Sequence, residues 1–146
     1  MERDILIRAS PQRVWSVLVD PGRSPDWEAG LVAVEDVRGR LDEPAASCTH
    51  VMNFRGRKLH GEAEVTEAFA PHTRAMRVQP PLTLTAVRRE RLVATEAGTQ
   101  LTIELNYETR GGPLGALLNV AFTRPRLAMV LAQSARNLKR LVESEL

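Results

Sequence analysis

His50 is the residue of this sequence whose type and surroundings are best suited to acid–base chemistry. The strand-like segment 46–55 alternates between a more apolar set of side chains, to which Cys48 and His50 belong, and a more polar set. An imidazole on the inner face of a strand could protonate or deprotonate a bound carbonyl compound near neutral pH. The sequence assigns it no carboxylate partner, so a structural histidine satisfied by one neighbour is the favoured interpretation.

Tyr107 is the second candidate, because its phenol could donate a hydrogen bond to a ligand oxygen or simply lie at the rim of a pocket. Cys48 shares a strand face with His50, but this alone does not supply the environment that activates a cysteine nucleophile. His50, His60 and His72 have no paired ligand spacing, so no metal site is predicted. No cofactor is predicted either, since the chain has no glycine-rich phosphate loop and no nucleophile elbow.

The amino-terminal segment predicts a short strand followed by two helices. Residues 5–9 alternate as a strand does. Ser10 can then cap a helix, and the fixed φ of Pro11 suits its first position. Residues 20–22 end that helix, and residues 24–27 could form a second short helical turn.

The rest of the chain predicts an antiparallel meander and a long final helix. From Gly30 onwards, short turns separate about six strand-like segments. Beyond Pro113, leucines recur at helical spacing to the end of the chain, and Pro125 predicts a kink or break near residues 122–123. No linker or repeat interrupts this order, so residues 1–146 are predicted to form one domain.

The strand predicted over 82–95 has an ambiguous inner face. Its even positions begin with leucines and an alanine but continue into Arg88 and Glu90. Because an unpaired buried charge is costly, we expect a bulge or an exposed strand end here. A pair of these two charges near a cavity mouth is the alternative.

Three motifs together resemble a known superfamily. The segments are Ala-Ser-Pro-Gln-Arg-Val-Trp at 9–15, Pro-Asp-Trp at 25–27 and Gly-Gly-Pro-Leu-Gly-Ala-Leu-Leu at 111–118. With the meander and final helix they resemble the START-like, birch-pollen-allergen-like superfamily, and within it the bacterial polyketide cyclase/dehydrase and lipid-transport group. The resemblance covers essentially the whole chain. It implies an α+β helix-grip fold, in which a curved antiparallel sheet of about seven strands wraps around a long C-terminal helix, with two short helices after the first strand.

This arrangement leaves a cavity between the sheet and the final helix, and strand alternation selects its lining. An apolar lining with few polar groups suits an apolar or aromatic small molecule fixed by one or two hydrogen bonds. The predicted lining residues are Trp27 at the entrance, His50, Met52, Phe54, Leu59, Ala63, Val65, Met76, Val78, Leu84, Leu105, Tyr107, Leu118 and Phe122.

Members of the superfamily bind sterols, lipids, polyketides, quinones or plant hormones, and only some are enzymes. Our leading hypothesis is therefore binding of a hydrophobic small molecule that is polyketide-, lipid- or aromatic-like. The alternative is a polyketide cyclase, aromatase or dehydratase acting on a poly-β-ketone, with His50 and Tyr107 transferring protons or polarising carbonyls. A third hypothesis is a protein-interaction module of the quinone-associated or chaperone-activating type, which predicts a shallow or filled cavity and a large exposed apolar patch.

The composition argues against several other partners. The 20 basic and 18 acidic residues are interspersed and aromatic residues make up only 4%, so nucleic-acid binding is not expected. No apolar run approaches the roughly 18 residues that span a bilayer, so stable membrane insertion is not expected. The first residues do not read as a signal peptide, which makes a cytoplasmic location the default. The sequence leaves open a homodimer through the last helix.

Overall fold

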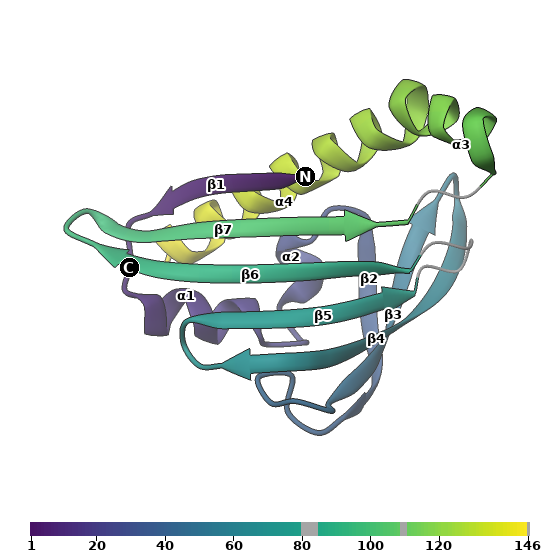
Figure 1. The fold of residues 1–146 in the computed structure, drawn as a ribbon. Coiled ribbons are helices and arrows are strands. Elements are labelled where there is room, and N and C mark those ends of the chain that lie inside the picture. Colours follow the sequence, from purple (N-terminus) through teal and green to yellow (C-terminus); the bar gives the residue numbers. More distant parts are fainter. Residues whose placement is uncertain (80–84, 109–110, 146) are drawn as a thin grey trace.

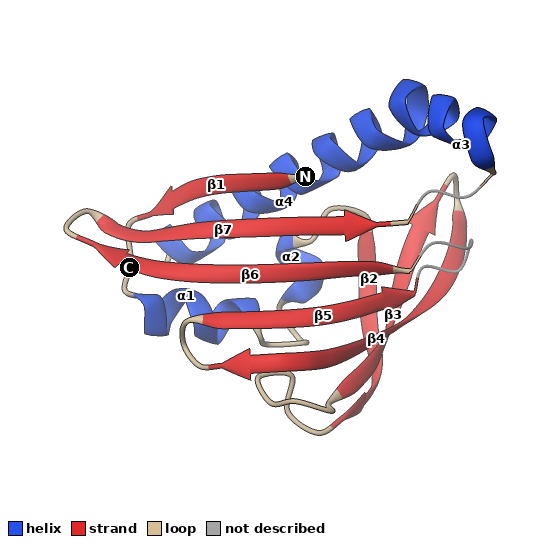
Figure 2. Ribbon diagram, viewed as in Figure 1, coloured by secondary structure: helices blue, strands red, loops and turns tan. Residues whose placement is uncertain are grey.

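In the computed structural model, which describes residues 1–79, 85–108 and 111–145, seven strands form one antiparallel sheet (Figure 1). Its order is β1-β7-β6-β5-β4-β3-β2, so every strand after the first pairs with its neighbour in sequence. The helices cover one face of the curved sheet (Figure 2). This arrangement confirms the predicted helix-grip fold. The strands are β1 (Glu2–Ile7), β2 (Leu31–Arg38), β3 (Ser47–Phe54), β4 (Arg57–Phe69), β5 (Thr73–Gln79), β6 (Ala86–Thr95) and β7 (Gly98–Tyr107).

The two predicted amino-terminal helices are present as α1 (Pro11–Leu18) and α2 (Ser24–Trp27). Ser10 caps α1, and its side-chain oxygen accepts a hydrogen bond from the Arg13 N–H at 3.3 Å. α1 buries an apolar face in the larger core cluster, which also contains residues of β1, β6, β7 and the last helix. A smaller cluster lies under β3, β4 and β5.

The final helix has an irregular turn where Pro125 predicts one. It begins as α3 (Gly112–Leu118), widens into the π-turn η1 (Asn119–Thr123) and continues as α4 (Arg124–Glu143). The Arg124 N–H donates to the Asn119 carbonyl, five residues earlier. Because Pro125 has no N–H to donate, the regular α-helical pattern cannot pass through this point. The predicted break near residues 122–123 is confirmed, and it takes the form of a π-turn.

The two ends of this long helix differ in burial. α4 buries Leu131, Ala135, Leu138 and Val142 in the larger core cluster, whereas α3 and η1 bury no residue. α3 lies at the opposite end of the molecule from α1 (Figure 1).

The expectation about apolar runs needs correction at this helix. By length and composition alone, Gly112–Glu143 contains a window apolar enough to cross a membrane, with a mean hydropathy of 1.2. Only 6% of that window is buried, so packing into the core does not account for its apolar character.

The predicted bulge at Arg88 is wrong. β6 pairs with β5 and β7 without a shift of register, and Arg88 and Glu90 both stay on the inner face. A register shift occurs instead in β4, between Val65 and Glu67, and beyond it Phe69 turns out to solvent. The inner face can hold the two charges because other charged residues pair with them.

Candidate ligand-binding cavity

A cavity of about 420 Å³ lies between the sheet and the last helix. Its strand residues come from β3, β5, β6 and β7, and its helix residues come from the end of α2, from η1 and from α4. The walls are mainly aliphatic and aromatic, with a few polar side chains among them. The lining residues are Trp27, Glu28, Ala29, His50, Met52, Val78, Ala86, Arg88, Ile103, Leu105, Tyr107, Thr123, Leu127, Val130, Leu131 and Ser134.

The structure brings six of the predicted lining residues to this cavity: Trp27, His50, Met52, Val78, Leu105 and Tyr107. Trp27 is fully buried, so it lies in the interior and not at the entrance as predicted. Ala63, Val65 and Met76 face inward but belong to the smaller core cluster. Leu59 is half-buried and outside the lining.

Two predicted helix contacts are displaced from the cavity. Leu118 and Phe122 are exposed to solvent, and the helix side of the cavity is formed by Thr123, Leu127 and Leu131 instead. The π-turn shifts the helical phase between α3 and α4, so spacing counted from α3 does not carry into α4. The predictions for the Leu84 side chain and the Phe54 side chain lie outside what the structure describes.

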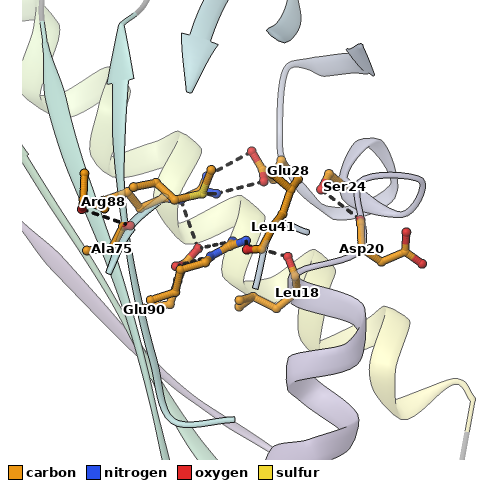
Figure 3. A network of polar contacts seen from close by, with 11 residues as sticks. Leu18, Asp20, Ser24, Glu28, Leu41, Ala75, Arg88 and Glu90 are labelled. Atoms are coloured by element: carbon orange, nitrogen blue, oxygen red, sulfur yellow. Dashed lines mark hydrogen bonds and ion pairs between the residues drawn. The ribbon is translucent and has the colours of Figure 1, made fainter. Parts of the chain in front are cut away.

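A buried ion pair joins β5 to β6 beside the cavity. Arg74 Nε and Nη2 donate to the two carboxylate oxygens of Glu90 at 3.1 and 2.8 Å, and both side chains are almost fully buried. Arg74 also donates to the carbonyls of Leu41 and Leu18, at 3.0 and 3.5 Å (Figure 3). This pairing meets the condition under which buried charges are tolerated, namely that each charge is compensated and hydrogen-bonded.

A second pair extends this network to the cavity wall. Arg88 Nη1 and Nη2 donate to the Glu28 carboxylate at 3.0 and 3.2 Å, and Arg88 Nε forms an ion pair with Glu90 at 3.2 Å (Figure 3). The guanidinium also lies 5.8 Å from the centre of the Trp27 ring. Burial lowers the pKa of Arg88, but the nearby carboxylates of Glu28 and Glu90 together raise it by more than burial lowers it. Arg88 therefore stays charged. Burial raises the pKa of Glu28, but the attraction and hydrogen bonds of Arg88, together with His50 and Arg74, outweigh this and leave the pKa below its usual value.

His50 lies on β3 next to this network and is buried. Burial lowers its pKa from 6.5, Glu28 opposes the shift, and Arg88 and Arg74 add to it. The imidazole is therefore neutral near neutral pH, with one nitrogen able to donate and the other able to accept. Among the described residues, none makes a hydrogen bond to this imidazole.

Two hydroxyl groups also line the cavity. Ser134 Oγ accepts a hydrogen bond from the Ala29 N–H at 2.9 Å, and no described residue accepts its own proton. The Tyr107 hydroxyl donates to Asn119 Oδ1 and so links β7 to η1. Tyr107 can therefore accept a hydrogen bond from a ligand, but its proton is already in use.

Cys48 is buried on the same face of β3 as His50. Burial raises its pKa to about 11, with a further contribution from Glu28. A thiol with this pKa is almost entirely protonated at neutral pH, so it does not have the character of an activated nucleophile.

Comparison with known proteins identifies the family. The sequence model described as polyketide cyclase/dehydrase and lipid transport matches residues 1–143. The chain belongs to this family. The family match confirms the resemblance found in the sequence motifs, and it supports a role in binding hydrophobic molecules. No curated protein matches the chain at a significant level.

Solved structures similar to this family member share its fold. A conserved protein from Geobacillus kaustophilus superimposes with a TM-score of 0.78 at 17% identity, covering 98% of this chain and 94% of that one. A Rhodobacter sphaeroides protein gives 0.73 at 20% identity, with 98% and 91% covered. Ara h 8.0201 gives 0.72 at 14% identity, with 99% and 97% covered.

Sequence reasoning missed most of the polar part of this family member's cavity. Glu28, Arg88 and Ser134 line it, and none was among the predicted lining residues, although an Arg88–Glu90 pair near the cavity mouth was the alternative for that strand. A signal was available, because Arg74 lies directly opposite Glu90 on the neighbouring strand, and pairing on one inner face favours opposite charges. Glu28 gave no comparable signal, since it reaches Arg88 across 60 residues of sequence.

Proposed function

We propose that this protein binds a hydrophobic small molecule in the cavity between the sheet and α4. The observation that carries the proposal is the cavity of about 420 Å³, with apolar walls and a few polar groups at buried positions. Both the size and the composition are typical of small-molecule sites, which run from about 300 to 1,000 Å³. The family, whose description names polyketide cyclases, dehydrases and lipid transport, supports the same role.

The proposal is tested with N-phenyl-1-naphthylamine, a neutral apolar dye that fluoresces in apolar surroundings. Leu105 faces the cavity and Asn106, the next residue of β7, is exposed on the other side. Leu105→Trp fills part of the cavity, whereas Asn106→Trp adds the same side chain outside it. We expect saturable dye binding by the natural protein and by Asn106→Trp, and a loss of about tenfold or more in affinity for Leu105→Trp.

Equal dye affinities in the two tryptophan variants would contradict this proposal, because the dye would then bind elsewhere, for example on the exposed apolar side chains of α3. Native mass spectrometry of protein purified from its own host complements this experiment. A co-purifying small molecule, absent from Leu105→Trp, would give the chemical class of the natural ligand.

The catalytic alternative, a cyclase, aromatase or dehydratase acting on a poly-β-ketone, is favoured by one observation. The neutral His50 imidazole lines the cavity with no hydrogen bond to the described residues, so it could transfer a proton to or from a bound carbonyl compound. Tyr107 would act by accepting a hydrogen bond, since its proton goes to Asn119. Turnover lost in His50→Ala but kept in His60→Ala, with both proteins folded, would favour the enzyme.

The protein-interaction hypothesis has weaker support. It predicts a shallow or filled cavity together with a large exposed apolar patch. Exposed apolar side chains are present along α3 and η1, yet the cavity is of ligand size. We therefore rank this hypothesis below ligand binding.

A further inference from the structure

The charges beside the cavity cancel one another. Arg74 and Arg88 contribute two positive charges, and Glu28 and Glu90 contribute two negative ones. Both carboxylate oxygens of Glu28 accept from Arg88, and both oxygens of Glu90 accept from Arg74. Each arginine therefore already has a carboxylate counter-ion, and neither is free to pair with a charged ligand.

A charged ligand group would meet unfavourable conditions at this wall. A carboxylate near Arg88 would approach the Glu28 carboxylate, which already occupies both terminal nitrogens of the guanidinium. An ammonium group would approach Arg88 itself. A buried charge without its own partner is strongly unfavourable, because the lost hydration is not compensated.

Uncharged hydrogen-bonding capacity also lines the cavity, from β3 and from α4. The neutral His50 imidazole offers one donor and one acceptor, and the Ser134 hydroxyl offers its proton. Ser134 is held by the N–H of Ala29, the residue that follows Glu28, so it is tied to the segment that carries the ion network. Both side chains are more than nine-tenths buried.

The depth of these groups sets the orientation of a ligand. His50, Ser134, Trp27 and Ile103 are buried, whereas Val130 is exposed and Thr123 and Leu127 are only half-buried. His50 and Ser134 therefore lie toward the interior, whereas Thr123, Leu127 and Val130 of the helix wall lie toward solvent.

We propose that the cavity selects an apolar molecule bearing an uncharged oxygen group, a hydroxyl or a carbonyl, which hydrogen-bonds to His50 and Ser134. This inference rests on the proposed function, since it names the class of molecule that the same cavity takes. A carbonyl oxygen accepts from both side chains. A hydroxyl accepts from Ser134 and donates to the unprotonated nitrogen of His50. Either group satisfies polar atoms that would otherwise lack a partner inside the protein.

Three matched compounds test the selection: hexylbenzene, 4-hexylphenol and 4-hexylbenzoate. At about pH 7.5 the phenol is neutral and the benzoate is ionised. Each compound is titrated against N-phenyl-1-naphthylamine bound to the natural protein, and its dissociation constant is obtained from the loss of dye fluorescence. We expect the phenol to bind about tenfold or more tightly than the benzoate, because the benzoate carboxylate finds no free cation.

Substitutions of the two polar side chains separate hydrogen bonding from general hydrophobicity. Ser134→Ala and His50→Leu should each weaken phenol binding about five- to tenfold, while hexylbenzene changes less than about twofold. Ser16→Ala and His60→Leu alter exposed residues of the same types and should change neither compound.

Glu28→Gln tests the charge argument directly. It frees Arg88 from one carboxylate, so the benzoate should gain about tenfold or more relative to the phenol. If Glu28→Gln does not fold, the ratio of phenol to benzoate affinity in the natural protein and the effect of Ser134→Ala decide the matter.

The outcomes distinguish this inference from the proposed function. If none of the three compounds displaces the dye and the dye itself does not bind, the proposed function fails. If hexylbenzene and the phenol bind but Ser134→Ala and His50→Leu leave both unchanged, the head-group inference fails while the proposed function stands. Preferential binding of the benzoate to the natural protein, or an unchanged ratio in Glu28→Gln, would overturn the conclusion that the group is uncharged.

Discussion

At the scale of single residues, Arg74 and Glu90 form an ion pair whose two side chains are almost fully buried. Their ion pair lies between the two core clusters, because Arg74 also bonds the carbonyl of Leu18, in the larger cluster, and that of Leu41, in the smaller one. A buried pair of this kind is costly to break, since the remaining partner keeps its charge without compensation.

We therefore predict that Glu90→Gln lowers the free energy of unfolding by about 3–5 kcal/mol. The matched control is Glu67→Gln, because Glu67 on β4 forms an ion pair with Arg89 on β6, but with side chains that are 58% and 51% exposed. That change should cost less than about 1 kcal/mol, since exposed ion pairs contribute little. Urea unfolding of the three proteins measures both values, and similar losses in the two variants would contradict the assignment of the buried pair.

At the scale of elements, the last helix consists of two parts with different roles. α4 packs into the larger core cluster and holds one wall of the cavity, and α3 with η1 presents apolar side chains to solvent. A hydrogen bond from Tyr107 to Asn119 links η1 to the sheet. Stability should therefore be distributed unevenly along this helix.

Two leucine substitutions in this helix check that difference. Leu138 is fully buried, so Leu138→Ala should lower the free energy of unfolding by about 2–5 kcal/mol through lost burial and the cavity left behind. Leu117 is 64% exposed, so Leu117→Ala should change it by less than about 0.5 kcal/mol. A large loss for Leu117→Ala in thermal or urea unfolding would mean that α3 is covered in solution.

At the scale of the whole molecule, the cavity wall depends on charges that come from distant parts of the chain. Glu28 follows α2, Arg74 is on β5, Arg88 and Glu90 are on β6, and His50 on β3 is next to them. Only the closed fold brings these groups together, so the protonation of His50 is coupled to global stability.

The pH dependence of unfolding should reveal this coupling. The pKa of His50 is lowered in the folded state, so the unfolded chain takes up the proton first as the pH falls below about 6.5. The contribution of His50 therefore reduces stability as the pH falls from about 6.5 to its folded pKa, by at most about 1.4 kcal/mol per pH unit.

His50→Leu removes this contribution, and its unfolding free energy should fall less steeply than that of the natural protein over this range. His60→Leu, which changes an exposed histidine, should follow the natural protein. Parallel curves for the natural protein and His50→Leu would show that His50 titrates alike in the folded and unfolded chain. Glu28 does not interfere in this window, because its lowered pKa affects stability only at more acidic pH.

By itself, the sequence determined the order of the elements and most of the strand faces. Ser10 and Pro11 mark the start of α1, and Pro125 marks the irregular turn of the last helix. Alternation placed His50 and Leu105 on the inner face correctly. These features depend on local backbone geometry and on the alternation of side chains along a strand. Both are properties of a single element and do not depend on the elements packed against it.

Only the tertiary structure decided the polar wall of the cavity and the helix residues that face it. Whether Arg88 can point inward depends on Glu28, 60 residues away, because the cost of burying a charge is set by its partner. Phe122 lies within the π-turn and Leu131 lies beyond it, and the final placement of α4 follows from its packing on β1, α1 and α2. Long-range partners and helix docking are properties of the assembled chain, so no local pattern encodes them.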